Sequence, residues 1–245
     1  MADVAIVTGC SRGLGRALTE RFLQKGWVVY GVARNAPLLT HDNFIFHQCD
    51  LSAPHSLPPL AEWLRNLPPE GETVLLNNAG TIHPTTPYVS LEHHALQKLM
   101  ALNITTPLLL MSLFSKHLPR TRSARAHMVN ISSGAGKHPY KSWLPYCSSK
   151  AALDMATRTA ALEEGEGGIT VVSFSPGVMD TPMQSEIRAM DDATFPHLQR
   201  FRKLKSEGEL TPPEHIAERL ITYIEQHLFT QGAIVDYRTL PDPSF

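Results

Sequence analysis

Seven short apolar runs with the pattern of β-strands recur along this chain, and helical patterns lie between most of them. A chain that alternates strands and helices in this way favours a parallel sheet with helices on both faces. The runs occupy residues 4–8, 27–33, 44–49, 73–78, 127–132, 170–175 and 233–237. We therefore expect an α/β fold: a single domain over residues 1–245, doubly wound, with about seven mostly parallel strands. A short helix is expected at 60–67 and an exposed loop at 120–125.

Composition excludes several classes of protein. The 245 residues carry 22 basic and 23 acidic side chains, a net charge of −1, so no basic surface for nucleic acid is expected. The apolar runs look too short to span a bilayer, and the N-terminus lacks the pattern of a signal peptide. Cys10, Cys49 and Cys147 are odd in number and far apart, which fits a reducing cytosol. We expect a cytoplasmic protein without nucleic-acid or membrane partners.

The first strand-like run leads directly into a glycine-rich turn that holds Gly9, Gly13 and Gly15. An amphipathic helix follows, with apolar residues at helical spacing over 14–22. Glycines let the backbone approach a phosphate, and the first N–H groups of a helix point at it. The pattern is G-x-x-x-G-x-G, whereas the standard dinucleotide fingerprint is G-x-G-x-x-G. It indicates a Rossmann-like phosphate site; the alternative is an ordinary glycine-rich turn.

A tyrosine and a lysine four residues apart, Tyr146 and Lys150, share one face of a predicted helix. A nearby ammonium favours the phenolate and lowers the pKa of the phenol, which would let Tyr146 transfer a proton near neutral pH. Ser133 follows a predicted strand thirteen positions earlier, and its hydroxyl could polarise a substrate oxygen. Taken alone, the pair could equally be a solvated helix pair that contributes only about 0.2–0.5 kcal/mol.

Together these features resemble the short-chain dehydrogenase/reductase family over essentially the whole chain. The resemblance rests on Thr8-Gly9-x-x-x-Gly13-x-Gly15, Asn77-Asn78-Ala79-Gly80, Asn103, Ser133, Tyr146 with Lys150, and Ser175-Pro176-Gly177 followed by Thr181. It implies catalytic roles for Asn103, Ser133, Tyr146 and Lys150. Ser133 and Tyr146 would donate hydrogen bonds to the reacting oxygen, Lys150 would also bind the nicotinamide ribose, and Asn103 would hold a water that links Lys150 to solvent.

The absence of a carboxylate between Glu20 and Asp42 favours NADP(H) over NAD, because an acid there would hold the ribose 2′-hydroxyl. Arg34 could instead bind a 2′-phosphate, and Arg12 could add a second cation. Each arginine could also be a solvated surface residue, and Asp50 could cap the next helix rather than contact adenine. The cofactor-binding residues expected are Gly9, Ser11, Arg12, Gly13, Leu14, Gly15, Arg34, Asn35, Asp50, Leu51, Asn78, Ala79, Gly80, Lys150, Pro176, Gly177, Val178, Met179, Thr181, Met183 and Gln184.

Residues 180–210 break the alternation of strands and helices and are rich in Met and Phe. A lid over the substrate is expected there, although these side chains could merely pack beneath a helical insertion. The second half also resembles the sepiapterin reductases and bacterial benzil-type diketone reductases of the family. That resemblance implies that Asp236 anchors a pterin ring; the alternative is a solvated strand-end residue. The substrate contacts expected are Ser133, Tyr146, Gly177 and Asp236.

The resemblance implies an NADPH-dependent carbonyl reductase that acts on a vicinal dicarbonyl or a pterin side chain, as a homodimer or homotetramer. The alternatives are an NADP-dependent alcohol dehydrogenase of the same family and a non-catalytic NADP-sensing protein. No metal site is expected, because adjacent His93 and His94 do not share a helix face and no His-x-x-x-His pair has a supporting carboxylate.

Overall fold

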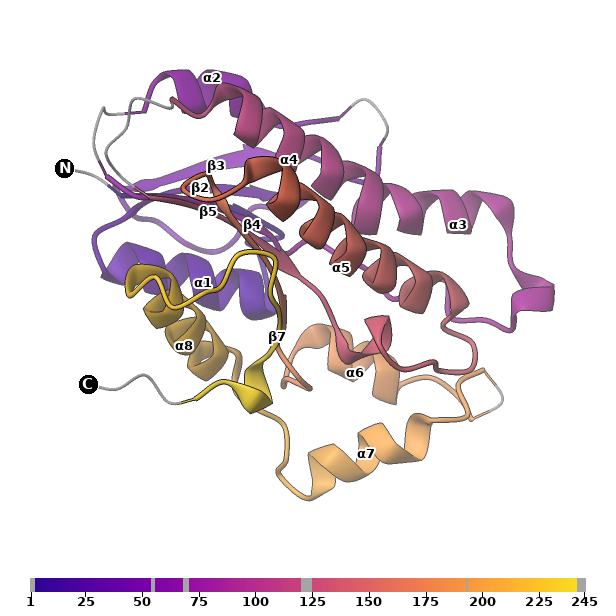
Figure 1. Cartoon of the computed structure of the whole chain (residues 1–245). Coiled ribbons are helices and arrows are strands. Elements are labelled where there is room, and N and C mark those ends of the chain that lie inside the picture. The colour runs from indigo at the N-terminus through magenta and orange to yellow at the C-terminus, as the bar shows by residue number, and fades with distance from the viewer. Residues whose placement is uncertain (1–2, 54–55, 68–70, 120–124, 193, 242–245) are drawn as a thin grey trace.

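A computed structural model of the chain describes residues 3–53, 56–67, 71–119, 125–192 and 194–241 (Figure 1). Seven strands form one sheet in which every neighbouring pair is parallel. They are β1 (Val4–Thr8), β2 (Val28–Ala33), β3 (Phe44–Gln48), β4 (Thr73–Asn77), β5 (Ala126–Ile131), β6 (Thr170–Ser175) and β7 (Ile234–Asp236). Each strand begins and ends within one residue of its expected bounds, and the α/β doubly wound prediction is confirmed.

Helices cover both faces of the sheet (Figure 1). One face packs against α1 (Gly13–Gln24) and α8 (Pro213–Glu225). The other packs against α2 (Leu60–Arg65), α4 (Thr106–His117) and α5 (Leu144–Glu164). The remaining helices are α3 (His93–Met100), α6 (Pro182–Arg188) and α7 (Leu198–Ser206), and short 3₁₀ turns occupy Tyr88–Ser90, Gly134–Gly136 and Tyr237–Thr239.

The sequence of the first βα unit explains its local structure. The run VAIVT is β-branched in four of its five positions and is buried along its whole length as β1. In α1 the apolar residues recur at helical spacing, and Leu18 and Phe22 are fully buried against the sheet. Burying side chains of this size contributes about 1.5–3 kcal/mol each. The same apolar positions therefore fix both the helix and the side of the sheet on which it lies.

The strand order β3-β2-β1-β4-β5-β6-β7 reverses direction between β1 and β4. In open α/β sheets this is where the loops after neighbouring strands diverge and leave room for a ligand. Thr8, the last residue of β1, fastens the two strands: its Oγ1 donates to the carbonyl of Leu76 at 3.1 Å and accepts from the N–H groups of Asn78 and Ala79 at 2.9 and 3.0 Å. The carboxyl edge is therefore held rigidly at the point where the strand order reverses.

Helix α3 continues into α4 through a π-helical turn over Ala101–Thr105. The combined helix, His93–His117, is long and apolar enough to cross a membrane by length and composition, with a mean hydropathy of 1.3 over its best window, so the expectation that no segment is long enough is wrong. Its inner face is nevertheless packed on the sheet: Leu110, Met111 and Phe114 are at most 5% exposed. This packing accounts for the apolar residues of the inner face, which belong to the 39% of the window that is buried.

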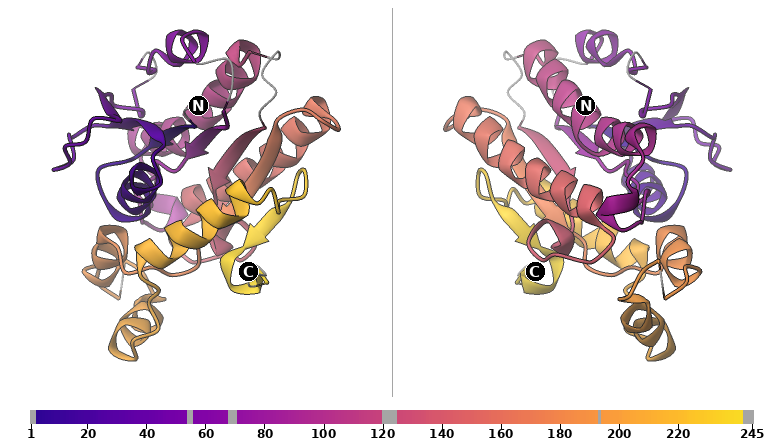
Figure 2. Two further views of the ribbon diagram at one scale, coloured as in Figure 1. Left: turned by 90° about the vertical axis from the view of Figure 1, so that its left-hand side faces the viewer. Right: turned by 90° about the vertical axis from the view of Figure 1, so that its right-hand side faces the viewer.

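Residues 180–210 form α6 and α7, which project from the body of the molecule beyond the carboxyl edge of the sheet (Figure 2). Residue 193 in this segment lies outside the described residues. So does most of the loop expected at 120–125, of which only exposed Arg125 is described.

Candidate active site

A cavity of about 1180 Å³ opens at the carboxyl ends of the strands, beneath the insertion. It is lined by nearly every residue that the sequence assigned to the site. These are Gly9, Ser11, Arg12, Gly13, Leu14, Arg34, Asn35, Asp50, Leu51, Asn78, Ala79, Gly80, Ser133, Tyr146, Lys150, Pro176, Gly177, Val178, Met179, Thr181, Met183, Gln184 and Asp236. Gly15 and Asn103 do not line it; both lie just behind its wall.

The glycine turn between β1 and α1 has no room for side chains. Gly9 has a φ of +70°, which L side chains rarely adopt. A Cβ on Gly15 would lie 2.1 Å from the carbonyl oxygen of Gly9 and 2.4 Å from Nδ2 of Asn78. Asn78 in turn donates from Nδ2 to the carbonyl of Thr8 at 2.9 Å. The first turn of α1 thus approaches β1 closely and, since Arg12 at its N-cap makes no side-chain cap, its N–H groups are free to bind an anion.

Tyr146 and Lys150 lie one turn apart near the start of α5, and Ser133 lies directly after β5. Tyr146 is 7% exposed and Lys150 is 5% exposed. Nζ of Lys150 donates to the carbonyl oxygen of Ile131 at 2.7 Å and lies 5.8 Å from the centre of the Tyr146 ring. Ser133 begins the turn after β5, where its Oγ accepts from the N–H of Ala135 at 3.2 Å. The three polar groups therefore meet at one wall of the cavity.

Burial changes the titration of this group in a way that the sequence did not predict. Desolvation raises the pKa of the Tyr146 phenol, and the hydrogen bond with Ser133 acts in the opposite direction. Burial also lowers the pKa of Lys150 to about 8, with Asp154 opposing it. The expectation that the pKa of Tyr146 is lowered is therefore not met, because the loss of solvation outweighs the hydrogen bond with Ser133. Tyr146 keeps its proton at neutral pH and has the protonation state of a general acid.

Asn103 lies in the π-helical turn, 1% exposed. Its side chain bonds the backbone of Thr81 twice, accepting from N–H and donating to the carbonyl, both at 2.9 Å, and donates to Oγ of Ser149 at 3.1 Å. A Cβ on Gly80 would lie 3.4 Å from Oδ1 of Asn103 and 3.7 Å from Nζ of Lys150. Glycine at this position leaves the polar ends of Asn103 and Lys150 facing the same small space.

Arg34 and Arg12, the two arginines expected to bind the 2′-phosphate of the cofactor, have different surroundings. Arg34 is exposed just past β2 and lines the cavity near Asp50. Two hydrogen bonds from Ser52 lower the pKa of Asp50, and Arg34 adds to the effect. Arg12 differs from the prediction, because its guanidinium forms an ion pair with Glu186 of α6 at 2.9 Å. Arg12 therefore connects the glycine turn to the insertion, whereas Arg34 is placed to meet a ligand.

Asp236, at the end of β7, lines the cavity but its carboxylate already has a cationic partner. Oδ1 and Oδ2 accept from the guanidinium of Arg238 at 2.9 and 2.6 Å, and Oδ1 also accepts from the backbone N–H of Arg238 at 3.0 Å. These contacts lower the pKa of Asp236. The side chain is neither a solvated strand end nor a free acceptor.

Comparison with known proteins identifies the family. Residues 3–192 match the short chain dehydrogenase family. This chain belongs to that family. It is 40% identical to a benzil reductase ((S)-benzoin forming) of Bacillus subtilis over 91% of this chain and 94% of the relative, and 34% identical to the sepiapterin reductase of Meriones unguiculatus over 96% and 95%. A short chain dehydrogenase/reductase structure from Saccharomyces cerevisiae superposes with a TM-score of 0.82, covering 98% of this chain and 97% of the other at 27% identity.

A nicotinamide dinucleotide, the cofactor type of short chain dehydrogenases, fits the residues present. The glycine turn provides the close backbone approach that a pyrophosphate needs. At the far wall, Nε2 of Gln184 is buried and has no hydrogen-bond partner among the described residues, although it belongs to a side chain that lines the cavity. A buried amide without a partner is rare and indicates that a ligand completes the wall.

The substrate end of the cavity contains residues to which the sequence assigned no role. Trp143 stacks on Phe195 with ring centres 4.6 Å apart, and Tyr140 packs edge-on against His197 at 5.2 Å. Other cavity-lining residues missed are His138, Arg200, Phe201 and Arg238. Phe195, Leu198 and Phe201 of the insertion pack in one buried cluster with Trp143 and Tyr146. The aromatic residues around 140–146 could have indicated an aromatic wall in the sequence. The aromatic residues against which they pack, however, lie fifty or more positions away in the chain.

Proposed function

We propose that this short chain dehydrogenase is an NADPH-dependent carbonyl reductase and that its substrate is a vicinal dicarbonyl with aromatic substituents. The supporting observation is that the proton donor Tyr146 forms part of an aromatic wall with Trp143 and the insertion's Phe201. Aromatic rings pack well against such a wall, in offset or edge-to-face contacts. Ser133 and Tyr146 present their hydroxyl groups beside this wall, where they can meet the carbonyl oxygen of a molecule whose rings pack on the aromatic residues.

Four side chains carry the reaction in this proposal. NADPH supplies the hydride when it is bound. The hydroxyl groups of Ser133 and Tyr146 donate hydrogen bonds to the carbonyl oxygen, where negative charge develops. Tyr146 then gives its proton to that oxygen, and its raised pKa keeps it protonated beforehand. Lys150 holds a positive charge below Tyr146 and stabilises the phenolate that remains, while Asn103 helps return a proton through the space beside Gly80.

The preference for NADPH over NADH rests on Arg34 in this proposal. Its guanidinium is exposed at the end of β2, at the cofactor end of the cavity. A planar guanidinium can bind a 2′-phosphate through two parallel hydrogen bonds. For Arg12 to bind the 2′-phosphate as a second cation, its guanidinium would have to leave the ion pair with Glu186.

Residues 180–210 act as a substrate lid in this proposal. The insertion places Phe201 at the cavity and buries Phe195 and Leu198 against the start of α5. Met183 and Met190 lie at the edge of the same cluster, and their flexible side chains can adjust to ligands of different shape. Closure over the substrate would exclude water from the reacting carbonyl.

A pterin side chain is the second candidate substrate, favoured by the 34% identity to a sepiapterin reductase and by Asp236 at the cavity wall. Asp236 would have to accept from the pterin N–H groups while it holds Arg238. That competition favours the diketone. Oxidation of an alcohol by the same residues is less well supported, because Arg34 favours NADP(H) and NADPH usually drives reduction. NADP sensing without catalysis is less well supported because Tyr146 and Lys150 are both present at the cavity.

We place the enzyme in the cytoplasm as a homodimer or homotetramer that acts on small molecules. Its three cysteines are free, as in a reducing compartment. Helices α4 and α5 expose large apolar side chains, with Leu162 83% and Met155 59% exposed, which is the kind of surface that a second subunit covers.

The test is NADPH oxidation with benzil, sepiapterin, 2,3-butanedione and a simple ketone, using the native enzyme and Asp236→Asn. We expect benzil to be turned over faster than sepiapterin. Asp236→Asn should affect both substrates to a similar extent, because the substitution acts by weakening the hold on Arg238. Sepiapterin reduction that is selectively lost in Asp236→Asn would favour the pterin. No reduction of any carbonyl would refute the proposed activity.

A further inference from the structure

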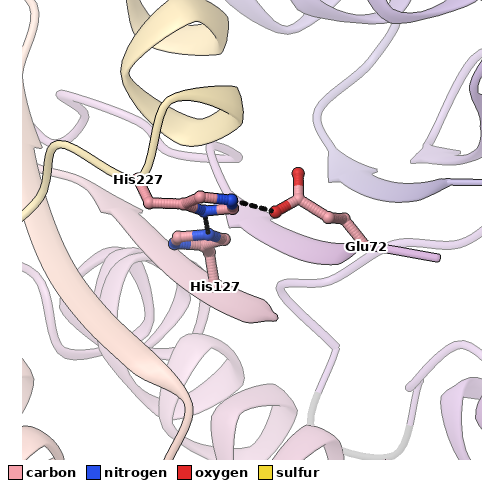
Figure 3. Close-up of side chains that lie close together, drawn as sticks. All are labelled: Glu72, His127 and His227. Atoms are coloured by element: carbon pink, nitrogen blue, oxygen red, sulfur yellow. Dashed lines mark hydrogen bonds and ion pairs between the residues drawn. The ribbon is translucent and has the colours of Figure 1, made fainter. Parts of the chain in front are cut away.

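Glu72, His127 and His227 form a cluster at the edge of the sheet opposite the active site (Figure 3). Glu72 immediately precedes β4, His127 is the second residue of β5, and His227 lies in the turn that follows α8. Because all strands are parallel, the amino-terminal ends of β4 and β5 lie far from the cavity at the carboxyl ends. The cluster therefore takes no part in the carbonyl chemistry proposed above.

The three side chains approach one another closely. Nδ1 of His227 lies 3.4 Å from Nε2 of His127, and Nε2 of His227 lies 3.2 Å from Oε1 of Glu72. One potential ligand atom from each residue lies within 4.8 Å of the other two. For comparison, ligand atoms about 2.0–2.1 Å from a tetrahedral zinc ion lie about 3.3 Å from one another. The rings of His127 and His227 are stacked with an interplanar angle of 6°, so one of them must turn for both nitrogens to point at a shared ion.

The supporting backbone is fixed on every side. His127 pairs in register with Val74 of β4. The N–H of Glu72 donates to Oδ1 of Asp3 at 2.7 Å. His227 has a φ of +53° and lies in a tight turn, in which its N–H donates a hydrogen bond to the carbonyl of Ile224 at 3.0 Å. Ligands held on rigid elements reduce the ordering that an ion must impose.

The cluster also contains groups that a cation would complement. His127 is 1% exposed, and the nitrogen that faces the cluster, Nε2, lies 3.4 Å from Nδ1 of His227. Oε1 of Glu72 is buried and has no hydrogen-bond partner among the described residues, although Nε2 of His227 lies 3.2 Å away. A positive ion at this point would be balanced by the carboxylate of Glu72 and could accept the lone pair of a neutral imidazole.

We propose that Glu72, His127 and His227 bind a divalent transition-metal ion of the zinc class. Two imidazoles and one carboxylate are a common donor set for Zn²⁺, whereas Ca²⁺ and Mg²⁺ require oxygen ligands. Each imidazole gives one nitrogen to the ion. His227 presently directs one nitrogen to each neighbour, so its ring turns when the ion binds; its side chain is 28% exposed and has room to do so. Water fills the fourth position from the exposed side.

The ion has a structural role in this proposal. It connects the residue before β4 and the start of β5 to the turn after α8. These three segments are distant from one another in sequence. Spacing between neighbouring histidines indicates no metal site in this sequence, because these ligands lie 55 and 100 positions apart. Only the fold brings them together.

The experiment uses the full chain without a polyhistidine tag, dialysed against a chelator and titrated with Co²⁺ and then Zn²⁺. We expect one equivalent of Co²⁺ to give the visible absorption of a four-coordinate N/O site, and Zn²⁺ to displace it. At a hundredfold excess over its Kd, Zn²⁺ should raise Tm by about 5–10 °C. Glu72→Gln and His227→Asn should each lose the spectrum and the shift; Asn tolerates the positive φ at 227. His215→Asn, which changes an exposed histidine of α8, is the matched control.

NADPH oxidation by each variant without metal checks that the fold is intact, because the cluster lies away from the cavity. The proposal is overturned if Co²⁺ gives no absorption at millimolar concentration, and the cluster is then a hydrogen-bonded chain. It is also overturned if the spectrum has the intense bands of thiolate ligands, or if it persists unchanged in both Glu72→Gln and His227→Asn.

Discussion

The two ends of the active-site cavity are built in different ways. The cofactor end is made by backbone: Gly9 and Gly15 allow β1 and α1 to approach so closely that a Cβ would overlap a carbonyl oxygen. The substrate end is made by side chains, with Tyr140 and Trp143 packed against Phe195 and Phe201 of the insertion. The first depends on residues adjacent in sequence, whereas the second depends on segments that meet only in the fold.

This difference predicts how each end of the cavity responds to amino-acid substitution. A backbone cradle tolerates little substitution, because added atoms meet main chain that cannot move. An aromatic wall tolerates volume-conserving substitutions at modest cost. We therefore expect the cofactor end to respond to substitution in cofactor affinity and the substrate end to respond in selectivity, with Tyr146 between them affecting the rate of the chemical step.

The largest effect is expected for Tyr146→Phe. The ring and its packing on Trp143 remain, but the proton donor is removed, so kcat should fall about 10²- to 10⁴-fold. The Kd for NADPH, measured by fluorescence titration, should stay within about twofold because the cofactor end is unchanged. If the variant reduced carbonyls at the native rate, Tyr146 would not be the general acid, and the chemical step could not be assigned to the residue that lies between the two ends.

Arg34→Ala should act on the cofactor end alone. Loss of a charge-assisted contact with a 2′-phosphate should weaken NADPH binding about 10- to 150-fold and leave NADH binding unchanged. Arg65→Ala, an exposed arginine on α2, controls for a general change in surface charge. Equal affinities for NADPH and NADH in the native enzyme would contradict the role given to Arg34.

The rate of carbonyl reduction should depend on pH through Lys150. Its pKa is lowered to about 8, so the ammonium is present below that pH and is lost above it. We expect kcat to be constant near pH 6–7 and to fall about tenfold per unit above pH 8. Lys150→Met should remove this step in a stopped-flow profile. A profile of the native enzyme that stays flat up to pH 10 would show that the charge of Lys150 does not assist the reaction.

The smallest effect is expected for Phe201→Leu in the aromatic wall. Loss of ring contacts with Trp143 and Tyr140 should lower kcat/KM for benzil about 2- to 10-fold, because aromatic pairs contribute about 0.5–1.5 kcal/mol. The value for 2,3-butanedione and the Kd for NADPH should not change. Lys203→Gln, on the exposed side of α7, is the control. An equal loss for both diketones would show that Phe201 does not select aromatic substituents, and a changed Kd for NADPH would show that the two ends are not independent.

The sequence predicted the elements that local patterns control. The strand bounds followed from short apolar runs, and the residues that line the cofactor end followed from motifs whose members are neighbours in the chain. Two features could not be found in this way. The direction of the pKa shift of Tyr146 depends on how far tertiary packing buries it, and the pairing of Asp236 with Arg238 depends on the turn that follows β7.

The insertion shows the same limit. Its Met and Phe content indicated contact with apolar surface, but not which surface. Phe195 and Leu198 are fully buried, in contact with the start of α5, while Phe201 reaches the cavity. Ordinary packing therefore describes Phe195 and Leu198, whereas the proposed lid depends on Phe201.

The π-helical turn at Ala101–Thr105 limits how the length of the chain can vary there. Such a turn contains one residue more than regular α-helix would, and its greater width absorbs that residue. Deletion of one residue from this turn would leave an unbroken helix of good geometry, with α3 and α4 close to their present positions. It would remove the bulge that holds Asn103 against Thr81 and Ser149. A deletion that would pass unnoticed in most helices would here disconnect the loop after β4 from α5.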